Sequence, residues 1–214
     1  MVCPTDAPET VLGRVTRLLD AFRHGDGLTL SQLARHTGFP PSSTHRMLGQ
    51  LVDAGLVRRS ETRYHLGTAL IELGGLAVAY DRIHRAALPV LFGLRRELGV
   101  DVRLTVLDGD SLLCLAAVGR SFDAASRAGE RRPACGSADG VAALAHRAGE
   151  PREFVATGER IRCVAAAFPA GDGETAALSA SAPRERAPRE LGRRVRSAAD
   201  TIAAQLTGAA AGPP

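Results

Sequence analysis

The sequence has no lysine, so all 27 of its basic residues are arginines. Together with the many alanines and glycines, this bias is typical of a GC-rich genome, and arginine by itself therefore carries little information about function. Only four cysteines are present, Cys3, Cys114, Cys135 and Cys163. No two of them have Cys-x-x-Cys spacing, which argues against a zinc site, and nothing indicates a secreted disulfide framework. We expect a reduced protein without a metal site.

Targeting and membrane segments are also missing. The N-terminus has no basic region followed by an apolar core, the pattern that would mark a signal peptide. No apolar run approaches the roughly 18 uncharged residues that a membrane-spanning helix needs. We expect a cytoplasmic protein that does not insert into a membrane.

Motifs that would indicate catalysis are absent too. There is no Gly-x-x-x-x-Gly-Lys, Gly-x-Gly-x-x-Gly or His-Glu-x-x-His motif. The segment CGSADG around Ser137 lacks the Gly-x-Ser-x-Gly spacing of a nucleophile elbow. None of the six histidines pairs with a cysteine or an acid at the spacing of metal ligands. We therefore predict no catalytic residues, no metal and no cofactor, and we do not expect an enzyme.

The composition that is present is that of a globular protein. Of the 214 residues, 45% are hydrophobic and 23% are charged, and this length allows one large domain or two small ones. The formal net charge of +4 favours a polyanionic partner mildly, although a solvated basic surface gives the same balance.

The first 67 residues show the periodicity of three helices followed by a hairpin. Apolar residues recur at helical spacing in the three segments, and an alternating pattern around Glu61 predicts two short strands. Thr10 and Ser31 are the expected N-caps of the first two helices, which end before Gly25 and at Gly38. The expected helices lie within residues 11–24, 28–38 and 41–54, and the expected strands are 56–60 and 62–66.

The third helix has two contrasting faces. Its apolar stripe follows i, i+3, i+4, i+7 spacing and comprises Thr44, Met47, Leu48, Leu51 and Val52. A helix that reads DNA packs one face on its scaffold and presents short donors and acceptors on the other, with its N-terminal residues near the bases. The second helix and Gly38 supply the turn of a helix-turn-helix. The opposite, polar stripe comprises Ser42, His45, Arg46, Gly49, Gln50 and Asp53.

The hairpin that follows carries three arginines and a tyrosine, as a wing beside a recognition helix would. A solvated helix face and a charged hairpin are the plain alternative, but the order of three helices, hairpin and arginines favours a winged helix-turn-helix. The arginines are expected on DNA phosphates, and Tyr64 on a base or a phosphate. The predicted DNA contacts are Ser31, Gln32, Pro41, Ser42, Ser43, Thr44, His45, Arg46, Gln50, Arg58, Arg59, Arg63 and Tyr64.

Residues 68–98 are helical again, with Pro89 expected to break or kink the segment. The helix before this proline is apolar around much of its surface, so it needs burial. Either it is a core helix of a second domain, or it forms a dimer contact. The dimer alternative places Leu70, Leu73, Leu76 and Ala77 in the contact.

The second half of the chain alternates between hairpins and helices. Residues 102–109 and 111–119 form a hairpin with a turn at 108–110, and residues 161–183 form another around 170–173. A helix is expected at 138–149 and an amphipathic one at 189–206, and the tail after it should be disordered. The fold class is therefore α+β. The buried face of the last helix is predicted to be Leu191, Val195, Ala198, Ala199, Ile202 and Leu206.

The chain resembles the IclR family of bacterial transcriptional regulators. The similar blocks include RVTRLLDAF, LTLSQLARHTGFPPSSTHRMLGQLVDAGLV, RYHLGTALIELG, DVRLTVLDGDSLLCL, RRPACGSADGVAALA, IRCVAAAF and TAALSASAP, in the family's order from about residue 11 to 206. The resemblance implies a regulator that binds double-stranded operator DNA, dimerises through a linker helix into a homodimer or possibly a tetramer, and binds a small-molecule effector in a GAF-like antiparallel sheet with flanking helices. The implied parts are a winged helix-turn-helix at 1–67, the linker at 68–83, a shortened effector domain at 84–207 and a tail at 208–214.

Two departures from the family concern the effector domain. Only about fifteen residues lie between His146 and Ile161, where the family has several dozen, so a strand and helices are expected to be missing. Asp139 and Val141 occupy positions where the family commonly has a leucine and a lysine. An acid at the pocket edge favours a neutral or cationic effector. The implied pocket residues are Ser137, Ala138, Asp139, Cys163, Ser179 and Ser181.

Alternation along a strand places Ser179 and Ser181 on one face, which allows both to point into one cavity. The plain alternative is that Cys163 is a small core residue and that the serines cover an exposed sheet face. Two other functions also remain open. The chain is either a constitutive DNA-binding regulator that has lost effector sensing, or a winged-helix adaptor that binds proteins.

Overall fold

The computed structural model describes residues 10–119, 128–150, 154–157 and 160–210. Its backbone divides into two compact units, Met1–Ala77 and Val78–Pro214, and each is considered by itself. The division falls inside the helix that the sequence assigns to a linker. Within the described residues, no helix is long and apolar enough to cross a membrane.

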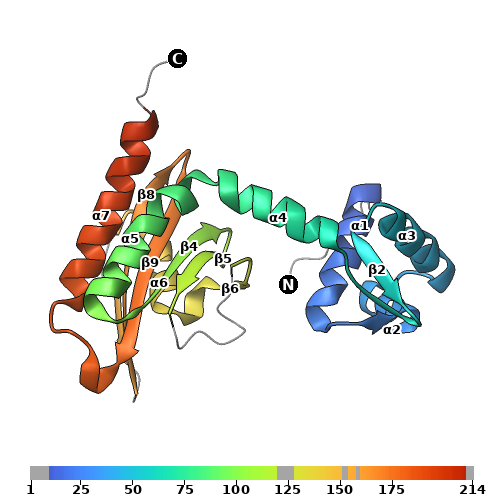
Figure 1. Cartoon of the computed structure of the whole chain (residues 1–214), viewed down its shortest axis with the longest axis horizontal. Coiled ribbons are helices and arrows are strands. Elements are labelled where there is room, and N and C mark those ends of the chain that lie inside the picture. Colours follow the sequence, from blue (N-terminus) through green and yellow to red (C-terminus); the bar gives the residue numbers. More distant parts are fainter. Residues whose placement is uncertain (1–9, 120–127, 151–153, 158–159, 211–214) are drawn as a thin grey trace. The chain divides into compact units, whose positions relative to one another are not determined.

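The first unit has the predicted three helices and hairpin (Figure 1). Its core comes from the apolar stripes of the helices and from the hairpin, and Leu18, Leu33, Leu48 and Val57 are almost fully buried in it. A two-residue strand that the sequence analysis missed pairs with the second strand of the hairpin, giving the sheet order β1-β3-β2. The elements are α1 (Val11–Asp20), a 3₁₀ turn (Ala21–His24), β1 (Leu28–Thr29), α2 (Leu30–Thr37), α3 (Pro41–Asp53), β2 (Val57–Ser60) and β3 (Arg63–Leu66).

The helix caps explain where α1 and α2 begin. The Thr10 hydroxyl accepts a hydrogen bond from the Gly13 amide, as predicted for the N-cap of α1. The N-cap of α2 is Thr29 rather than Ser31. Thr29 and Gln32 form a reciprocal capping box, in which the side chain of each accepts from the backbone amide of the other. The expectation for Ser31 was wrong because this Thr-x-x-Gln pattern fixes the start two residues earlier.

The break between the next two helices also differs from the prediction. The helix α4 (Thr68–Tyr80) ends before Asp81, whose carboxylate accepts a hydrogen bond from the His84 amide at 2.6 Å and caps α5 (Arg82–Leu98). Pro89 lies within α5. The chain therefore breaks where a side chain caps the new helix, and not at the proline.

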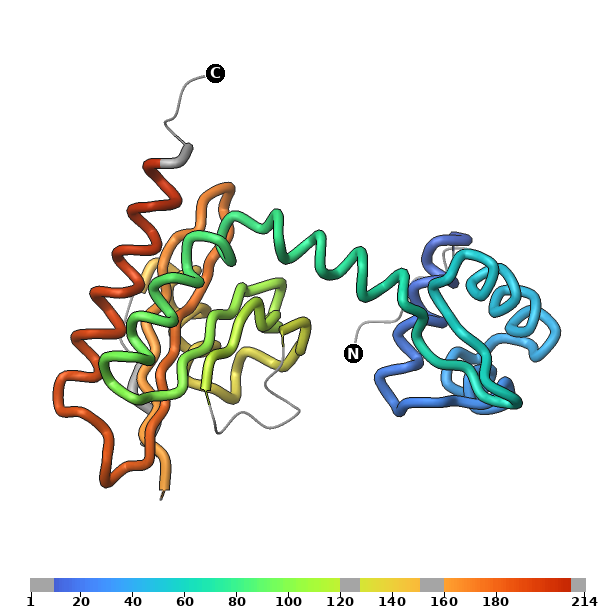
Figure 2. Tube along the Cα trace, viewed as in Figure 1, coloured from blue at the N-terminus to red at the C-terminus, as the bar shows by residue number. Residues whose placement is uncertain are grey.

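The second unit is built on one antiparallel sheet of six strands in the order β6-β5-β4-β9-β8-β7. The tube in Figure 2 follows the chain from α5 into the β4–β5 hairpin and later through β8 and β9 into the last helix. Both predicted hairpins and the α+β class are confirmed, whereas β6 and β7 were not foreseen. The strands are β4 (Asp101–Asp108), β5 (Ser111–Val118), β6 (Arg131–Pro133), β7 (Phe154–Thr157), β8 (Ile161–Gly171) and β9 (Glu174–Pro183).

Helices cover both faces of this sheet. α5 and α7 (Leu191–Ala210) pack on one face, where the whole predicted stripe of α7 from Leu191 to Leu206 is buried. The other face carries α6 (Ala138–Arg147). Residues 208–210 belong to α7, so that part of the expected disordered tail was wrong, and residues 211–214 lie outside the described residues.

The shortened segment before β8 is not empty of structure. β7 lies within it and pairs with β8, from Phe154 opposite Ala165 to Thr157 opposite Arg162. The short segment therefore contains a strand at this edge of the sheet.

Candidate DNA-binding surface and effector pocket

The helix α3 has the two faces that its sequence predicts. Thr44, Met47, Leu48 and Leu51 are buried in the first unit, and Val52 is half-buried beside them. On the opposite side Ser42, His45, Arg46, Gly49, Gln50 and Asp53 are all exposed. Pro41 occupies the first turn, where a missing amide costs no hydrogen bond. An exposed polar helix on a rigid apolar base is the arrangement that major-groove reading requires.

The β2–β3 hairpin presents arginines on its outer side. Arg58 and Arg59 are exposed, and the Arg59 Nε donates to the Glu61 carbonyl at 2.9 Å. Glu61 has a positive φ of 54°, which forms the tight turn. The guanidinium of Arg63 donates instead to the Gly27 carbonyl, so this side chain ties the hairpin to the loop before β1. Arg58 and Arg59 are thus better placed than Arg63 to meet phosphates.

Three predicted DNA contacts occupy other roles in the fold. Tyr64 is 5% exposed and belongs to the core, so its ring is not offered to a base. Thr44 is 0% exposed, and its hydroxyl donates to the Pro40 carbonyl. The Gln32 side-chain oxygen is held in the capping box of α2. Ser31, Pro41 and Ser42 are exposed and Ser43 is half-buried, and their role at DNA stays a prediction.

The six predicted effector residues lie around one pocket of about 230 Å³ in the second unit. The sheet register explains why they meet. Ser181 on β9 stands between Asp101 on β4 and Cys163 on β8, and Ser179 stands next to Arg103 and Ala165 in the row beside it. Strand alternation therefore places both serines on the pocket face, as the sequence analysis expected. Whether an effector binds among them stays a prediction.

The start of α6 closes the pocket from above the sheet. The Ser137 hydroxyl caps the helix by accepting from the Gly140 amide at 3.3 Å. Gly140 packs against the turn before α6, and a Cβ there would lie 1.9 Å from the Ala134 carbonyl oxygen. Only glycine at this position allows the first turn of α6 to sit so close to that backbone.

Three charged residues that the sequence analysis missed line the pocket, Asp101, Arg103 and Arg132. Arg132 forms an ion pair with Asp139, and the Thr105 hydroxyl donates to the same carboxylate at 3.4 Å. Asp101, at the other end, pairs with Arg95 at 2.8 Å. Because Arg132 compensates Asp139, the expectation of a neutral or cationic effector loses its basis. Alternation along β4 was the signal that could have found Arg103.

Cys163 is inert as a nucleophile in this setting. Burial raises the pKa of its thiol to about 11, and the Asp139 carboxylate acts in the same direction. The thiol is therefore protonated at neutral pH, where it acts as a small apolar wall. Burial likewise raises the pKa of Cys114, whereas Cys135 is exposed.

The helix α4 has no buried residue. Of the predicted dimer contacts, Leu73 is 56% exposed and Leu76 is 45% exposed, Ala77 is exposed and Leu70 is half-buried. Ile71 and Tyr80 are also exposed, both at 76%. Of the two alternatives for this helix, a core position is excluded within the described chain.

These features define a class of protein: a winged helix-turn-helix followed by an α+β domain that contains a small polar pocket. The sequence profile of the IclR helix-turn-helix domain matches residues 11–61. The chain is 37% identical over 97 residues to the HTH-type transcriptional regulator KipR of Bacillus subtilis, covering 45% of this chain and 39% of KipR. It is 30% identical over 139 residues to the HTH-type transcriptional regulator BhcR of Paracoccus denitrificans, covering 63% of this chain and 50% of BhcR.

The fold agrees with these matches. A solved IclR homolog from Microbacterium hydrocarbonoxydans, in complex with 4-hydroxybenzoate, superposes with a TM-score of 0.77 at 24% identity, over 93% of this chain and 100% of that one. Residues 11–61 thus match the IclR helix-turn-helix domain, and the described chain has the fold of this solved IclR homolog. Its alignments span half the length or less of the two curated relatives that it matches.

Proposed function

We propose that the protein is a transcriptional regulator that binds specific double-stranded DNA through α3 and the β2–β3 hairpin. The observation that carries the proposal is the exposed polar face of α3 on a buried apolar stripe, within a segment that matches a family of DNA-binding domains. The N-terminal part of such a helix reaches base edges, and arginine is the side chain that most often makes a specific base contact. Arg46 and His45 are therefore the expected base readers.

The test starts from DNA fragments enriched by the protein from a random pool. Arg46→Ala should weaken binding to the enriched site by about 1–3 kcal/mol and change the preferred sequence. Arg23→Ala is the matched control, because Arg23 is an exposed arginine of the same unit that pairs with Asp20 away from α3. An adaptor that binds only proteins would enrich no DNA sequence. If Arg46→Ala and Arg23→Ala bind the enriched site equally well, α3 does not contact the DNA bases.

We infer further that a small anion binds in the pocket beside α6. Two arginines, Arg103 and Arg132, line this pocket, and the planar guanidinium group suits two parallel hydrogen bonds to a carboxylate. Ser179 and Ser181 add hydroxyl donors. 4-Hydroxybenzoate is a first probe, because the Microbacterium homolog was solved in complex with this compound.

The inference is tested by measuring the melting temperature with 4-hydroxybenzoate and with short aliphatic carboxylates. A ligand of the pocket raises the melting temperature in the natural chain and not in Arg103→Ala or Ser179→Ala. Arg96→Ala, an exposed arginine of α5, is the control. If no anion stabilises the protein while DNA binding is intact, the constitutive regulator is the correct alternative.

We also propose that a second copy of the chain covers α4. Four large apolar side chains on one thirteen-residue helix are exposed, and paired half-sites supply the affinity that one helix-turn-helix lacks. Leu73→Asp should produce a monomer in sedimentation and weaken operator binding, whereas Glu72→Gln on the same helix should change neither. A natural chain that sediments as a monomer at micromolar concentration would contradict the proposal.

A further inference from the structure

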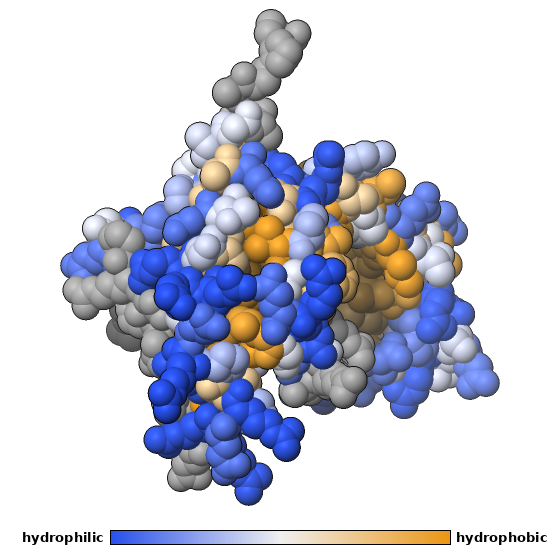
Figure 3. All heavy atoms as spheres, turned by 60° about the vertical axis from the view of Figure 1, so that its left-hand side comes forward, coloured by the Kyte–Doolittle hydropathy of each residue, from blue (hydrophilic) through white to orange (hydrophobic). Residues whose placement is uncertain are grey.

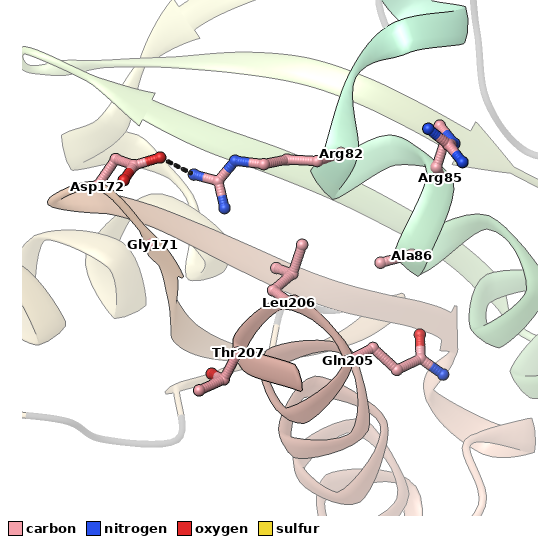
Figure 4. Close-up of a pocket in the computed structure, with 8 residues that line it drawn as sticks. All are labelled: Arg82, Arg85, Ala86, Gly171, Asp172, Gln205, Leu206 and Thr207. Atoms are coloured by element: carbon pink, nitrogen blue, oxygen red, sulfur yellow. Dashed lines mark ion pairs between the residues drawn. The ribbon is translucent and has the colours of Figure 1, made fainter. Parts of the chain in front are cut away.

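The second unit contains another, larger pocket, of about 740 Å³, on the opposite side of the sheet from α6. It lies where the first turn of α5, the turn between β8 and β9, and the end of α7 meet (Figure 4). Its volume is within the range of small-molecule sites, about 300–1,000 Å³. None of its lining residues belongs to the effector pocket beside α6.

One wall of this pocket is fixed by Arg82. Figure 4 shows its side chain reaching from α5 to the β8–β9 turn, where the guanidinium pairs with Asp172 at 3.2 Å and with Glu174 at 2.7 Å, and donates to the Ala170 carbonyl. Gly171 has a φ of +86°, and a Cβ there would lie 2.7 Å from a guanidinium nitrogen. The turn therefore has glycine both for its backbone conformation and for the close approach of Arg82.

The rest of the lining is amphipathic. Leu206 projects from α7 toward Arg82 in Figure 4, and Ala86 lies beside it on α5, so the floor is apolar. Gln205 and Thr207 add donors at the rim. Arg85 is exposed, and no acid of the described residues pairs with it. With Arg82 compensated by two carboxylates, Arg85 is the cation left for a ligand.

We propose that this pocket binds an amphipathic monocarboxylate, whose apolar body lies on Ala86 and Leu206 and whose carboxylate pairs with Arg85. An arginine can hold a carboxylate through two parallel hydrogen bonds, and the positive end of the α5 dipole adds to the attraction. Such a ligand would contact the turn of α5 that directly follows Asp81, the residue that separates α5 from α4. The proposal depends neither on DNA binding nor on the effector pocket.

The absence of tryptophan from the chain gives a direct test. Thr207→Trp places a single fluorophore at the rim, on an exposed helix position, and is titrated with octanoate in the full-length chain. We expect a saturable change in emission with half-saturation below about 1 mM, a modest affinity for a ligand of this size. Octylammonium, of the same length and opposite charge, should give no saturable change. Thr201→Trp reports from another face of α7, next to a different groove, and should not respond to octanoate.

The charge is tested in the Thr207→Trp background. Arg85→Glu should raise the half-saturation concentration of octanoate at least about tenfold, and Arg96→Glu, on the same helix outside the pocket, should leave it unchanged. Ser181→Ala, in the effector pocket, should also have no effect. Circular dichroism melting establishes that each variant folds. The proposal is overturned if octanoate gives no saturable change up to about 10 mM, if octylammonium binds equally well, or if Arg85→Glu behaves like Arg96→Glu.

Discussion

Arg132 on β6 forms an ion pair with Asp139 in the first turn of α6, and the two side chains differ in their burial. The Asp139 side chain is 3% exposed and that of Arg132 is 26% exposed. Thr105 donates to the same carboxylate from β4, so three separate elements converge on one buried charge. The pair thus fixes the helix that closes the effector pocket to the edge strand of the sheet.

Removing Arg132 should therefore be costly. Arg132→Ala leaves the Asp139 carboxylate buried without its counter-charge, and we expect a loss of about 3–5 kcal/mol in the free energy of unfolding. Urea unfolding measures it. Arg131→Ala is the matched control, because its partner Asp108 is 63% exposed and such a pair contributes about 0–1 kcal/mol. The double change Arg132→Leu with Asp139→Leu should restore most of the loss, and equal losses in the two single variants would contradict the assignment.

Tyr64 gives a test of the corrected DNA surface. Since the ring is buried in the core of the first unit, Tyr64→Phe should leave DNA affinity and its salt dependence unchanged. Tyr64→Ala should cost about 3–5 kcal/mol of stability, as truncation of a buried aromatic side chain does. Filter binding and thermal unfolding follow the two effects. If Tyr64→Phe loses DNA affinity at unchanged stability, the Tyr64 hydroxyl contacts DNA and this prediction is wrong.

Arg58 and Arg63 of the hairpin should differ in their effects on DNA binding and on melting temperature. Arg58→Ala removes one exposed cation, so the slope of log affinity against log salt concentration should fall by about one unit for a lost phosphate contact, at unchanged melting temperature. Arg63→Ala should lower the melting temperature as well, because it breaks the bond to the Gly27 carbonyl that ties hairpin and loop together. If the two variants have the same melting temperature, the hydrogen bond of Arg63 does not stabilise the fold.

The Cys163 thiol predicts a dependence of stability on alkaline pH. Its pKa in the folded state, about 11, lies above the ordinary value of 9.0, so the folded state holds this proton more tightly than the unfolded state. The associated stability is fully present below pH 9 and is lost as the pH rises toward 11, by an amount on the order of 2 kcal/mol. Cys163→Ala should reduce this decline in urea unfolding measured at pH 8 and at pH 10.5. Iodoacetamide at pH 8 should modify the exposed Cys135 before Cys163.

Periodicity predicted most of the fold, and the resemblance with strand alternation named six residues that line one pocket. The stripes of α3 and α7 were read correctly, because a helix in a small core must bury one face. Ser179 and Ser181 both line the pocket because residues two apart in a strand lie on the same face of the sheet. Such spacings can be read from one sequence because they depend only on which face of an element is buried.

Features that depend on one specific contact were missed. β1 has two residues and β6 three, too few for any period, and they exist because a neighbouring strand offers hydrogen bonds. Asp81 and Thr29 begin α5 and α2 through side-chain hydrogen bonds with backbone amides. In the sequence, Pro89 and Ser31 gave competing signals for these positions. Arg132 reaches the pocket from β6, a strand that the sequence analysis did not contain.

The exposure of α4 has a consequence for how the protein would respond to dilution. An isolated helix of thirteen residues is marginal in water, and the adjacent Gly74 and Gly75 each cost about 1 kcal/mol relative to alanine. Because no side chain of α4 is buried within the chain, the helix needs a packing partner to be stable. If a second copy of the chain covers α4, as proposed, dilution would uncover the helix and make it more sensitive to proteolysis. The concentration of the protein would then set the fraction of chains in which α4 is ordered.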